Sequence, residues 1–247
     1  MVDPKKPYGL VLAGGGGKGA YQIGVWKALR EMGIAEQIGV ISGASVGGLN
    51  AVLIADGDLA KAERIWKEIS PLQFMDVEPE EPGMYSREGL LTLIEENFHL
   101  EQFRERGPAI FVDACRKSDE KCRYFLLNNK STEDMKALLL ATSALPGVYP
   151  PVTFQGEEYI DGGVQDNLPI RPLYEKGYRK LITITLSDHA VVPKEQYPGA
   201  EFLCFSPSVS IGDFFDGTLD FAAEGAKSRL ELGYRDGIRV LSAYAIG

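Results

Sequence analysis

Short apolar runs along the chain predict strands. Residues 8–13 and 181–186 are almost continuous apolar or β-branched stretches, which are typical of strands buried on both faces of a parallel sheet. A short hairpin is expected around Gln155-Gly156, where a turn pair separates two extended runs. The strands that the runs predict cover residues 8–13, 38–41, 109–114, 123–127 and 181–186.

Amphipathic stretches fill the intervals between these runs and predict helices. Ser131 opens a capping-box pattern with Asp134, and Ser86 is a candidate N-cap for another helix. The predicted helices lie around 25–32, over 46–56, around 62–69, around 90–98 and over 135–143. Strands that alternate with helices predict an α/β fold with a mostly parallel central sheet and helices on both faces. In such folds, ligands bind at the carboxyl ends of the strands.

Residues 71–85 interrupt this alternation. The segment contains three prolines, several acidic residues and the apolar pairs Phe74-Met75 and Met84-Tyr85. Broken secondary structure with apolar pairs among acids is typical of a mobile lid or a lipid-contacting edge. A solvated connector whose apolar residues pack into the core is the simpler interpretation, and the lid or edge remains a candidate.

The overall composition is that of an ordinary globular protein. The chain has 247 residues, of which 45% are hydrophobic and 25% charged, so a single domain over 1–247 is expected. Its net charge of −9 supplies no basic surface for nucleic acid, which is not an expected partner. Transient contact with a membrane surface would depend on apolar insertion and gain little from anionic lipid.

The N-terminus and the cysteines bear on the compartment. Residues 1–7 lack the apolar stretch of a signal peptide, and no run approaches the ~18 apolar residues of a membrane span. A cytoplasmic location without a transmembrane segment is therefore expected, although removal of a leader would leave the same sequence. Cys115, Cys122 and Cys204 lack zinc-ligand spacing and are predicted to be buried structural thiols. No metal or other cofactor is expected.

Two glycine-rich turns carry the candidate chemistry, and each follows a predicted strand and precedes a predicted helix. The second turn is Gly43-Ala44-Ser45-Val46-Gly47, a Gly-x-Ser-x-Gly pattern that places its serine on a tight, exposed elbow. A glycine loop at a helix N-terminus aims backbone N–H groups at negative charge. Together the turns predict acyl transfer. The first turn comprises Gly14, Gly15, Gly16, Gly17, Lys18 and Gly19.

Other interpretations of these turns stay open. Ser45 could serve only as a helix N-cap. The spacing Gly14-x-Gly16-x-x-Gly19 also fits a module that binds a nucleotide or phosphate. A dinucleotide site needs an acidic residue near the end of the second strand, but this strand runs into Ser45 instead. The nucleotide interpretation is therefore disfavoured.

A serine nucleophile needs a base, and the sequence offers three candidates. His99 lies at the end of a predicted helix, where a surface or capping role is the simpler interpretation. His189 follows the last predicted strand, and the order Ser45, Asp161, His189 matches that of an α/β-hydrolase triad. Asp161 precedes two glycines after an extended run, which an ordinary Asp-Gly turn would also explain.

In order and spacing, three motifs of the chain resemble those of the patatin-like phospholipases. They are Gly15-Gly16-Gly17-Lys18-Gly19, Gly43-Ala44-Ser45-Val46-Gly47 and Asp161-Gly162-Gly163. The stretch from Ala141 to Pro151 also resembles the family's segment ahead of the aspartate, so the resemblance covers residues 8–186. Residues 187–247 are then expected to supply a C-terminal strand and helices of the same domain.

The resemblance implies a three-layer α/β sandwich that hydrolyses phospholipid or lysophospholipid esters with a Ser–Asp dyad and no histidine. Carried onto this chain, Ser45 would be the nucleophile and Asp161 the general base. The first glycine turn would form the oxyanion hole, chiefly through the amides of residues 15–17. The glycines that would shape the elbow and the aspartate loop are Gly43, Gly47, Gly162 and Gly163. A soluble esterase or thioesterase for short acyl chains with the same dyad is the alternative.

Overall fold

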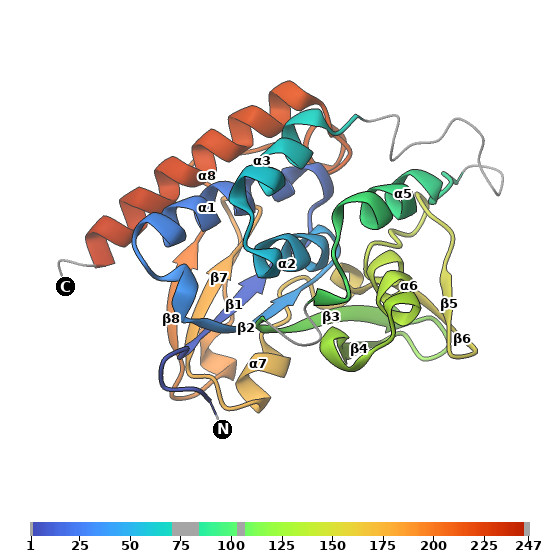
Figure 1. Ribbon diagram of the computed structural model, residues 1–247, viewed down its shortest axis with the longest axis horizontal. Helices are drawn as coiled ribbons and strands as arrows, with labels where there is room; N and C mark the ends of the chain where they lie inside the picture. The colour runs from blue at the N-terminus through green and yellow to red at the C-terminus, as the bar shows by residue number, and fades with distance from the viewer. Residues whose placement is uncertain (1, 71–83, 103–106, 245–247) are drawn as a thin grey trace.

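The computed structural model describes residues 2–70, 84–102 and 107–244, and Figure 1 shows their arrangement. Within these ranges, eight strands form one sheet in the order β5-β6-β3-β2-β1-β7-β8, with β4 paired to β3. The strands are β1 (Tyr8–Leu12), β2 (Ile38–Gly43), β3 (Ala109–Arg116), β4 (Lys121–Leu126), β5 (Val152–Phe154), β6 (Glu157–Asp161), β7 (Lys180–Ile184) and β8 (Glu201–Phe205). Each strand predicted from the apolar runs overlaps one of them.

Most of the sheet is parallel. Strand β1 pairs in parallel with β2 and β7, β2 with β3, and β7 with β8, while β4, β5 and β6 have antiparallel neighbours. The register places Leu12 beside Gly43 and Gly43 beside Val112, so β1 and β2 end together while β3 continues to Arg116. Further along β3, Ala114 pairs with Asp161 and brings β6 to the same region. The predicted α/β fold is confirmed.

Helices cover both faces of the sheet unequally. Figure 1 places α1, α2, α3 and α8 over one face and the short α7 against the other. The helices are α1 (Ala20–Glu31), α2 (Val46–Asp56), α3 (Leu59–Glu68), α5 (Glu88–Asn97), α6 (Thr132–Thr142), α7 (Arg171–Glu175) and α8 (Ala223–Tyr244). The predicted range 46–56 coincides with α2, and the other predicted helices overlap α1, α3, α5 and α6.

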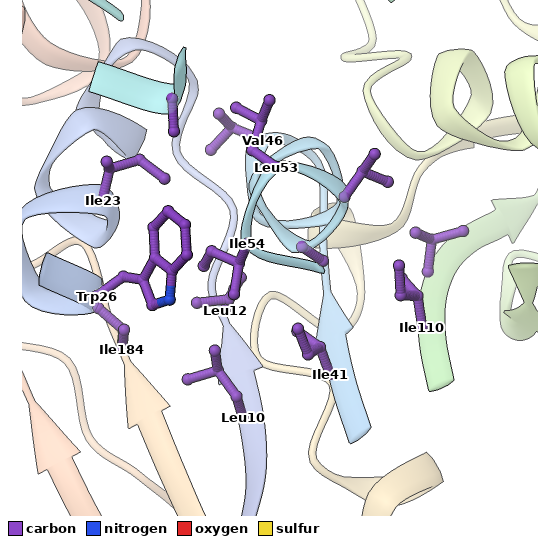
Figure 2. Packing of buried hydrophobic residues seen from close by; sticks show 14 of the residues in the cluster. Leu10, Leu12, Ile23, Trp26, Ile41, Val46, Leu53, Ile54, Ile110 and Ile184 are labelled. Carbon is purple, nitrogen blue, oxygen red and sulfur yellow. The ribbon is translucent and has the colours of Figure 1, made fainter. Parts of the chain in front are cut away.

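Alternate residues of the central strands pack into two cores. Leu10 and Leu12 of β1 contribute to the larger core, whereas Val11 packs with Ile170 and Leu173 on the opposite face. All five side chains are completely buried. Figure 2 shows the larger core, where side chains of α1 and α2 lie over those of β1, β2, β3 and β7. Because both faces are covered, β1 is a continuous apolar run rather than an alternating one.

Helices α1 and α8 approach closely because glycines face the partner backbone. A Cβ atom on Gly24 would collide with the carbonyl of Leu230, and one on Gly233 with the carbonyl of Tyr21. The buried Tyr21 hydroxyl also donates to Asp236 of α8 (3.2 Å). The last helix of the chain therefore fixes the helix that follows the first glycine turn.

The prediction of separate structural thiols is wrong for Cys115 and Cys122, which form a disulfide. The two residues stand directly opposite each other in the antiparallel register of β3 and β4. Directly opposed residues point to the same face of a sheet, which brings their sulfur atoms together. Cys204 on β8 is a free, half-buried thiol.

The segment 71–85, a candidate lid or lipid-contacting edge, lies outside the described residues except for its last two positions. The Tyr85 amide donates to the carbonyl of Val148 (2.8 Å). The Ser86 hydroxyl accepts the amide of Glu88 (3.2 Å). The N-cap of α5 is Arg87 and makes no side-chain capping bond, so the predicted N-cap at Ser86 is wrong by one residue. In the part of the chain that the structure describes, no helix is both long and apolar enough to cross a bilayer.

Candidate active site

Ser45 lies in a strained turn between β2 and α2. Its φ of 53° and ψ of −126° place it in a conformation that costs roughly 1–3 kcal/mol for a residue other than glycine. Adjacent glycines permit the turn, because a Cβ on Gly43 would overlap the backbone of Gly47 and one on Gly47 the carbonyl of Leu12. The Ser45 amide donates to Thr142 Oγ1 (2.9 Å). This geometry is that of a nucleophile elbow at the carboxyl edge of the sheet.

Asp161 ends β6 and faces Ser45. The Ser45 hydroxyl donates to the Asp161 carboxylate, whose Oδ1 also accepts the amide of Gly163 (2.8 Å). The Asp161 amide donates to the carbonyl of Ala144 (2.9 Å), which holds the strand end against the segment after α6. The structure thus brings together the serine and the aspartate that the motifs singled out.

A second carboxyl group, Asp113 on β3, lies behind the aspartate loop and is completely buried. Gly162 has no room for a side chain because the Asp113 carboxyl group occupies that space. The Thr142 hydroxyl donates to Asp113 Oδ1 (3.5 Å). Burial, followed by the charges of Asp166 and Asp161, raises the pKa of Asp113 well above its usual range.

Burial also determines the basicity of Asp161. The residue is 3% exposed, and the loss of hydration raises its pKa to about 6. Hydrogen bonds from Ser45 and from the Gly163 amide, together with the positive charge of Arg87, oppose this rise. The carboxylate is therefore ionised at neutral pH and more basic than a solvated aspartate, whose pKa is about 3.9.

We expect kcat/KM for ester hydrolysis to fall about tenfold per pH unit below about pH 6. The direction follows because a general base acts only when deprotonated, and the raised pKa of Asp161 moves the acidic limb upward. Steady-state rates on a soluble ester between about pH 4 and pH 8 measure this limb. An acidic limb near pH 4 would mean that Asp161 is solvated during turnover or is not the base.

The first glycine turn forms another side of the site. Its residues that line the pocket with Ser45 are Gly14, Gly15, Gly16 and Lys18. The Gly14 amide donates to the carbonyl of Asn167 and the Asn167 side-chain amide to the carbonyl of Gly14 (both 3.3 Å). The 3-10 helix Gly16–Gly19 continues into α1, so the first N–H groups of this helical unit lack intrahelical acceptors. Such groups can stabilise an oxyanion.

Gly17 and Gly19 do not line the described pocket but pack against neighbouring segments of the chain. A Cβ on Gly17 would overlap the backbone carbonyl of Asp220, and one on Gly19 would press against Val46 and Trp66. Both positions therefore require glycine for close packing. The turn is wedged between the segment before α8 on one side and α2 and α3 on the other.

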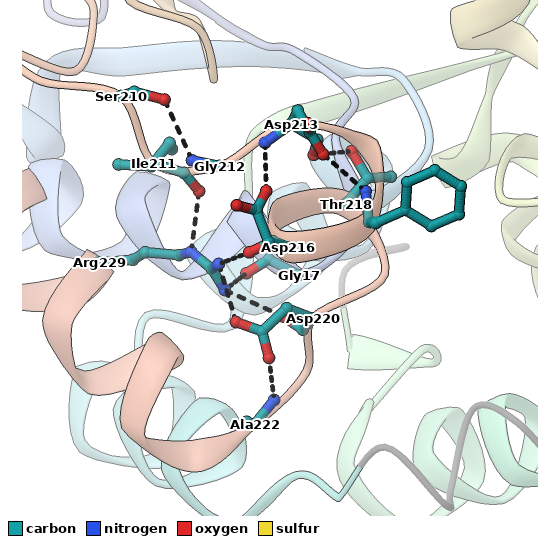
Figure 3. Close-up of polar contacts among 11 residues, drawn as sticks. Gly17, Ser210, Ile211, Gly212, Asp213, Asp216, Thr218, Asp220, Ala222 and Arg229 are labelled. Atoms are coloured by element: carbon teal, nitrogen blue, oxygen red, sulfur yellow. Dashed lines mark hydrogen bonds and ion pairs between the residues drawn. The ribbon is translucent and has the colours of Figure 1, made fainter.

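Arg229 of α8 ties the glycine turn to the segment before α8, as Figure 3 shows. Its guanidinium donates to the carbonyls of Gly17 (3.4 Å), Asp216 (2.9 Å) and Asp220 (3.0 Å), and it pairs with the Asp220 carboxylate (2.9 Å). Its Nε donates to the carbonyl of Ile211 (3.3 Å). One buried cation therefore satisfies several backbone carbonyls at once and fixes the turn.

The Ser45–Asp161 pair opens into a largely apolar pocket of about 380 Å³. Its apolar lining from α2, α3, α5 and the segment after α6 comprises Leu49, Leu53, Ile65, Trp66, Ile69, Leu90, Leu93, Phe98, Leu145 and Val148. The Trp66 indole N–H donates to Asn50 Oδ1 (3.0 Å), so its polar atom is satisfied. The pocket has the size and lining of a site for an apolar ligand. Among the described residues, no group of three or more His, Cys, Asp or Glu side chains could hold a metal ion.

Several residues that shape the site have no motif of their own. Thr142, Asn167 and Arg229 reach the two catalytic-type turns from distant parts of the chain. Arg87 donates to the carbonyls of Leu140 (2.7 Å) and Pro150, and so spans the segment that contacts Asp161. Among these residues, the sequence pointed only to Thr142, because it lies inside the stretch 141–151 that resembles the family.

Neither histidine takes part in the described site. The His189 side chain is 92% exposed and pairs with Asp188 (3.6 Å). His99 is exposed and lies beside Asp56 and Lys61 (both 3.4 Å). Neither residue lines the pocket that contains Ser45. The described contacts therefore give the Ser–Asp–His triad no support.

We expect His189→Ala to keep kcat/KM within about twofold of the wild-type value, because substitution of an exposed turn residue usually has little effect. Initial rates on a soluble ester at pH 7.5 provide the measurement. A loss as large as that of Ser45→Ala would restore the triad.

Comparisons with known proteins agree with this fold. A family model described as patatin-like phospholipase matches residues 10–174. Lysophospholipase NTE1 of Cryptococcus neoformans is 29% identical over 188 residues, which are 71% of this chain and 11% of that protein. The uncharacterized protein YjjU of Escherichia coli is 31% identical over 94 residues, 38% of this chain and 24% of that protein. The chain thus spans only about a tenth of the first relative's length.

Solved structures of other proteins have a similar fold. VipD from Legionella pneumophila has a TM-score of 0.67 and 13% identity, with 98% of this chain and 68% of that one covered. Human GIVD cytosolic phospholipase A2 has a TM-score of 0.52 and 11% identity, with 96% and 57% covered. The arrangement defines an α/β protein with a serine elbow at the sheet edge. Since the family model matches more than half of the sequence, the chain belongs to the patatin-like phospholipase family.

Proposed function

We propose that this chain is a lipid acyl hydrolase that cleaves carboxylic esters of phospholipids or lysophospholipids through Ser45 and Asp161. The observation that carries the proposal is the hydrogen-bonded Ser45–Asp161 pair, which faces an apolar pocket beside the first glycine turn. Acyl transfer needs a nucleophile, a base, oxyanion donors and space for the acyl group. Each requirement has a residue or a surface at this site.

In acylation, the Ser45 Oγ attacks the ester carbonyl carbon while its proton passes to Asp161. The carbonyl oxygen becomes an oxyanion that the pocket-lining amides of the first glycine turn stabilise, and one such donor typically contributes a factor of ~10²–10³. Protonated Asp161 then gives its proton to the departing alcohol oxygen. The products are a free alcohol and an acyl ester on Ser45.

In deacylation, the ionised Asp161 takes a proton from a water molecule whose oxygen attacks the acyl carbonyl. The second oxyanion uses the same donors as the first. When the adduct collapses, the Ser45 Oγ recovers its proton and the fatty acid leaves. A base with a pKa of about 6 suits both proton transfers, because it is ionised at neutral pH and accepts a proton more readily than a solvated aspartate.

The pocket and the names of similar proteins support a lipid substrate. The pocket residues contributed by α2, α3 and α5 are predominantly apolar, which suits an acyl chain better than a polar leaving group. Two of the similar proteins are called a lysophospholipase and a cytosolic phospholipase A2. Both are longer than this chain, so their names support the ester class rather than a particular headgroup.

A lipid panel tests the proposal. We expect wild-type protein to release fatty acid from phosphatidylcholine or lysophosphatidylcholine, and Ser45→Ala protein to release none. A parallel series of soluble esters with increasing acyl length separates the alternatives. Preference for the shortest acyl group without lipid turnover would indicate a soluble esterase or thioesterase. Absence of all ester turnover, with phosphate or nucleotide bound at residues 14–19, would indicate a binding module.

A further inference from the structure

Three large apolar side chains are exposed near the pocket. Phe215 is 78% exposed, Val164 is 49% exposed and Phe214 is 44% exposed. Phe214 and Phe215 are adjacent, and their rings stack edge to face with centroids 5.3 Å apart. A single exposed apolar residue is ordinary, but a cluster at one place is typical of an interaction surface.

The cluster is continuous with the site already described. Val164 and Phe214 line the same pocket as Ser45 and Asp161, whereas Phe215 is absent from the lining and extends into solvent. Val164 follows the aspartate loop directly in the sequence. A ligand that covered this surface would therefore lie at the entrance to the pocket.

Hydrogen bonds hold the backbone that carries the two phenylalanines. They belong to the π-helical turn Phe214–Thr218, in which the Asp213 side chain accepts the Phe215 amide (2.9 Å) and the Asp216 side chain accepts the Asp213 amide (2.7 Å). Arg229 binds the Asp216 carbonyl and, through the same guanidinium, the carbonyl of Gly17 (Figure 3). Because these contacts fix the backbone of the turn, little backbone entropy is lost when a ligand binds there.

The charges beside the cluster favour a surface without net negative charge. Asp213 and Asp216 are exposed, and Lys18 is half-buried nearby. Asp220 is neutralised by Arg229 (2.9 Å). These groups leave an excess of negative charge on a chain of net charge −9, so anionic lipid headgroups gain no attraction here.

We propose that Val164, Phe214 and Phe215 form the face by which the protein docks onto a zwitterionic phospholipid surface. Phe215 inserts into the interface, and the pocket entrance at Phe214 and Val164 then faces a lipid drawn from the same surface. Aromatic side chains favour the boundary between headgroups and acyl chains, which suits this exposed pair. The inference rests on the proposed function for its substrate, but the binding step itself requires no catalysis.

Partition of Ser45→Ala protein onto phosphatidylcholine vesicles tests the surface without hydrolysis. We expect Phe215→Ser in this background to lower the partition coefficient about tenfold, as the loss of one inserted aromatic side chain requires. The matched control is Val191→Ser, which removes a residue that is 86% exposed and does not line the pocket. This control should partition as the parent does.

The second arm uses the active protein. Phe215→Ser should lower turnover of phosphatidylcholine vesicles by a similar factor and leave hydrolysis of a soluble short-chain ester unchanged. If the active protein hydrolyses neither substrate, the proposed function fails, while the partition result still decides the docking surface. Equal partition of the Phe215→Ser and Val191→Ser proteins would overturn the inference. Binding that requires anionic lipid, or a change of oligomeric mass in place of lost partition, would overturn it as well.

Discussion

Ser45→Ala and Asp161→Asn are each expected to lower kcat/KM for ester hydrolysis by about 10³-fold or more. The first change removes the proposed nucleophile and the second removes the proposed base to which it is hydrogen-bonded. Because the two groups act as one unit, the double variant should be about as slow as the slower single variant. Initial rates on one soluble ester for the four proteins provide the measurement. Substantial activity in Asp161→Asn, or losses that multiply in the double variant, would contradict a dyad.

The stability of the Asp161→Asn variant is the control for folding. The folded-state pKa of Asp161, about 6, exceeds that of a solvated aspartate, about 3.9, so the native protein is destabilised when the carboxyl group is ionised. At pH 7.5 the amide removes this penalty, and we expect a gain of roughly 1–3 kcal/mol in the free energy of unfolding. The gain should shrink as the pH falls from 6 towards 4, where wild-type Asp161 becomes protonated. Denaturant titrations at the two pH values measure it.

Gly17→Ala is expected to lower kcat about 10²-fold, which is the typical cost of one misplaced oxyanion donor. The added methyl group would overlap the carbonyl of Asp220, so the turn at residues 14–19 must move away from the segment that Arg229 binds. The displaced amides then no longer meet the oxyanion. Because KM depends mainly on the apolar pocket, it should change much less than kcat, and steady-state kinetics on a soluble ester separate the two.

Gly33→Ala is the matched control for this substitution. Gly33 has a φ of 68° with open space around it, so alanine there introduces backbone strain without a collision. We expect a loss of about 1 kcal/mol in stability and an unchanged kcat. If both alanine variants lose activity in proportion to their stability, the position of the glycine turn is not what limits the reaction.

The two glycine turns were predictable because adjacent residues determine them. Residues 43 and 47 must be glycine for the Ser45 elbow to form. The small and apolar residues that follow predict the helix that the structure shows as α2. Asp161 was harder to identify, since Asp-Gly pairs are common in plain turns. Only its order relative to the other motifs distinguished it.

The supporting contacts were not predictable from local patterns. Thr142 lies 97 positions from Ser45, and Arg229 lies 212 positions from Gly17. Such contacts depend on how the strands order in the sheet and on where α8 returns to the start of the chain. The disulfide was not predicted for a related reason. One predicted strand ended at residue 114 and the next began at residue 123, so both cysteines were left out, and their pairing depends on the register of the sheet.

The most direct test of the account is peptide mapping after reaction with a fluorophosphonate that carries a long alkyl chain. One adduct is expected on Ser45 in wild-type protein, formed at the same rate in His189→Ala and much more slowly in Asp161→Asn. The Ser45→Ala protein should take up no adduct. An adduct on another residue, or labelling of Asp161→Asn at the wild-type rate, would contradict a Ser45 nucleophile activated by Asp161.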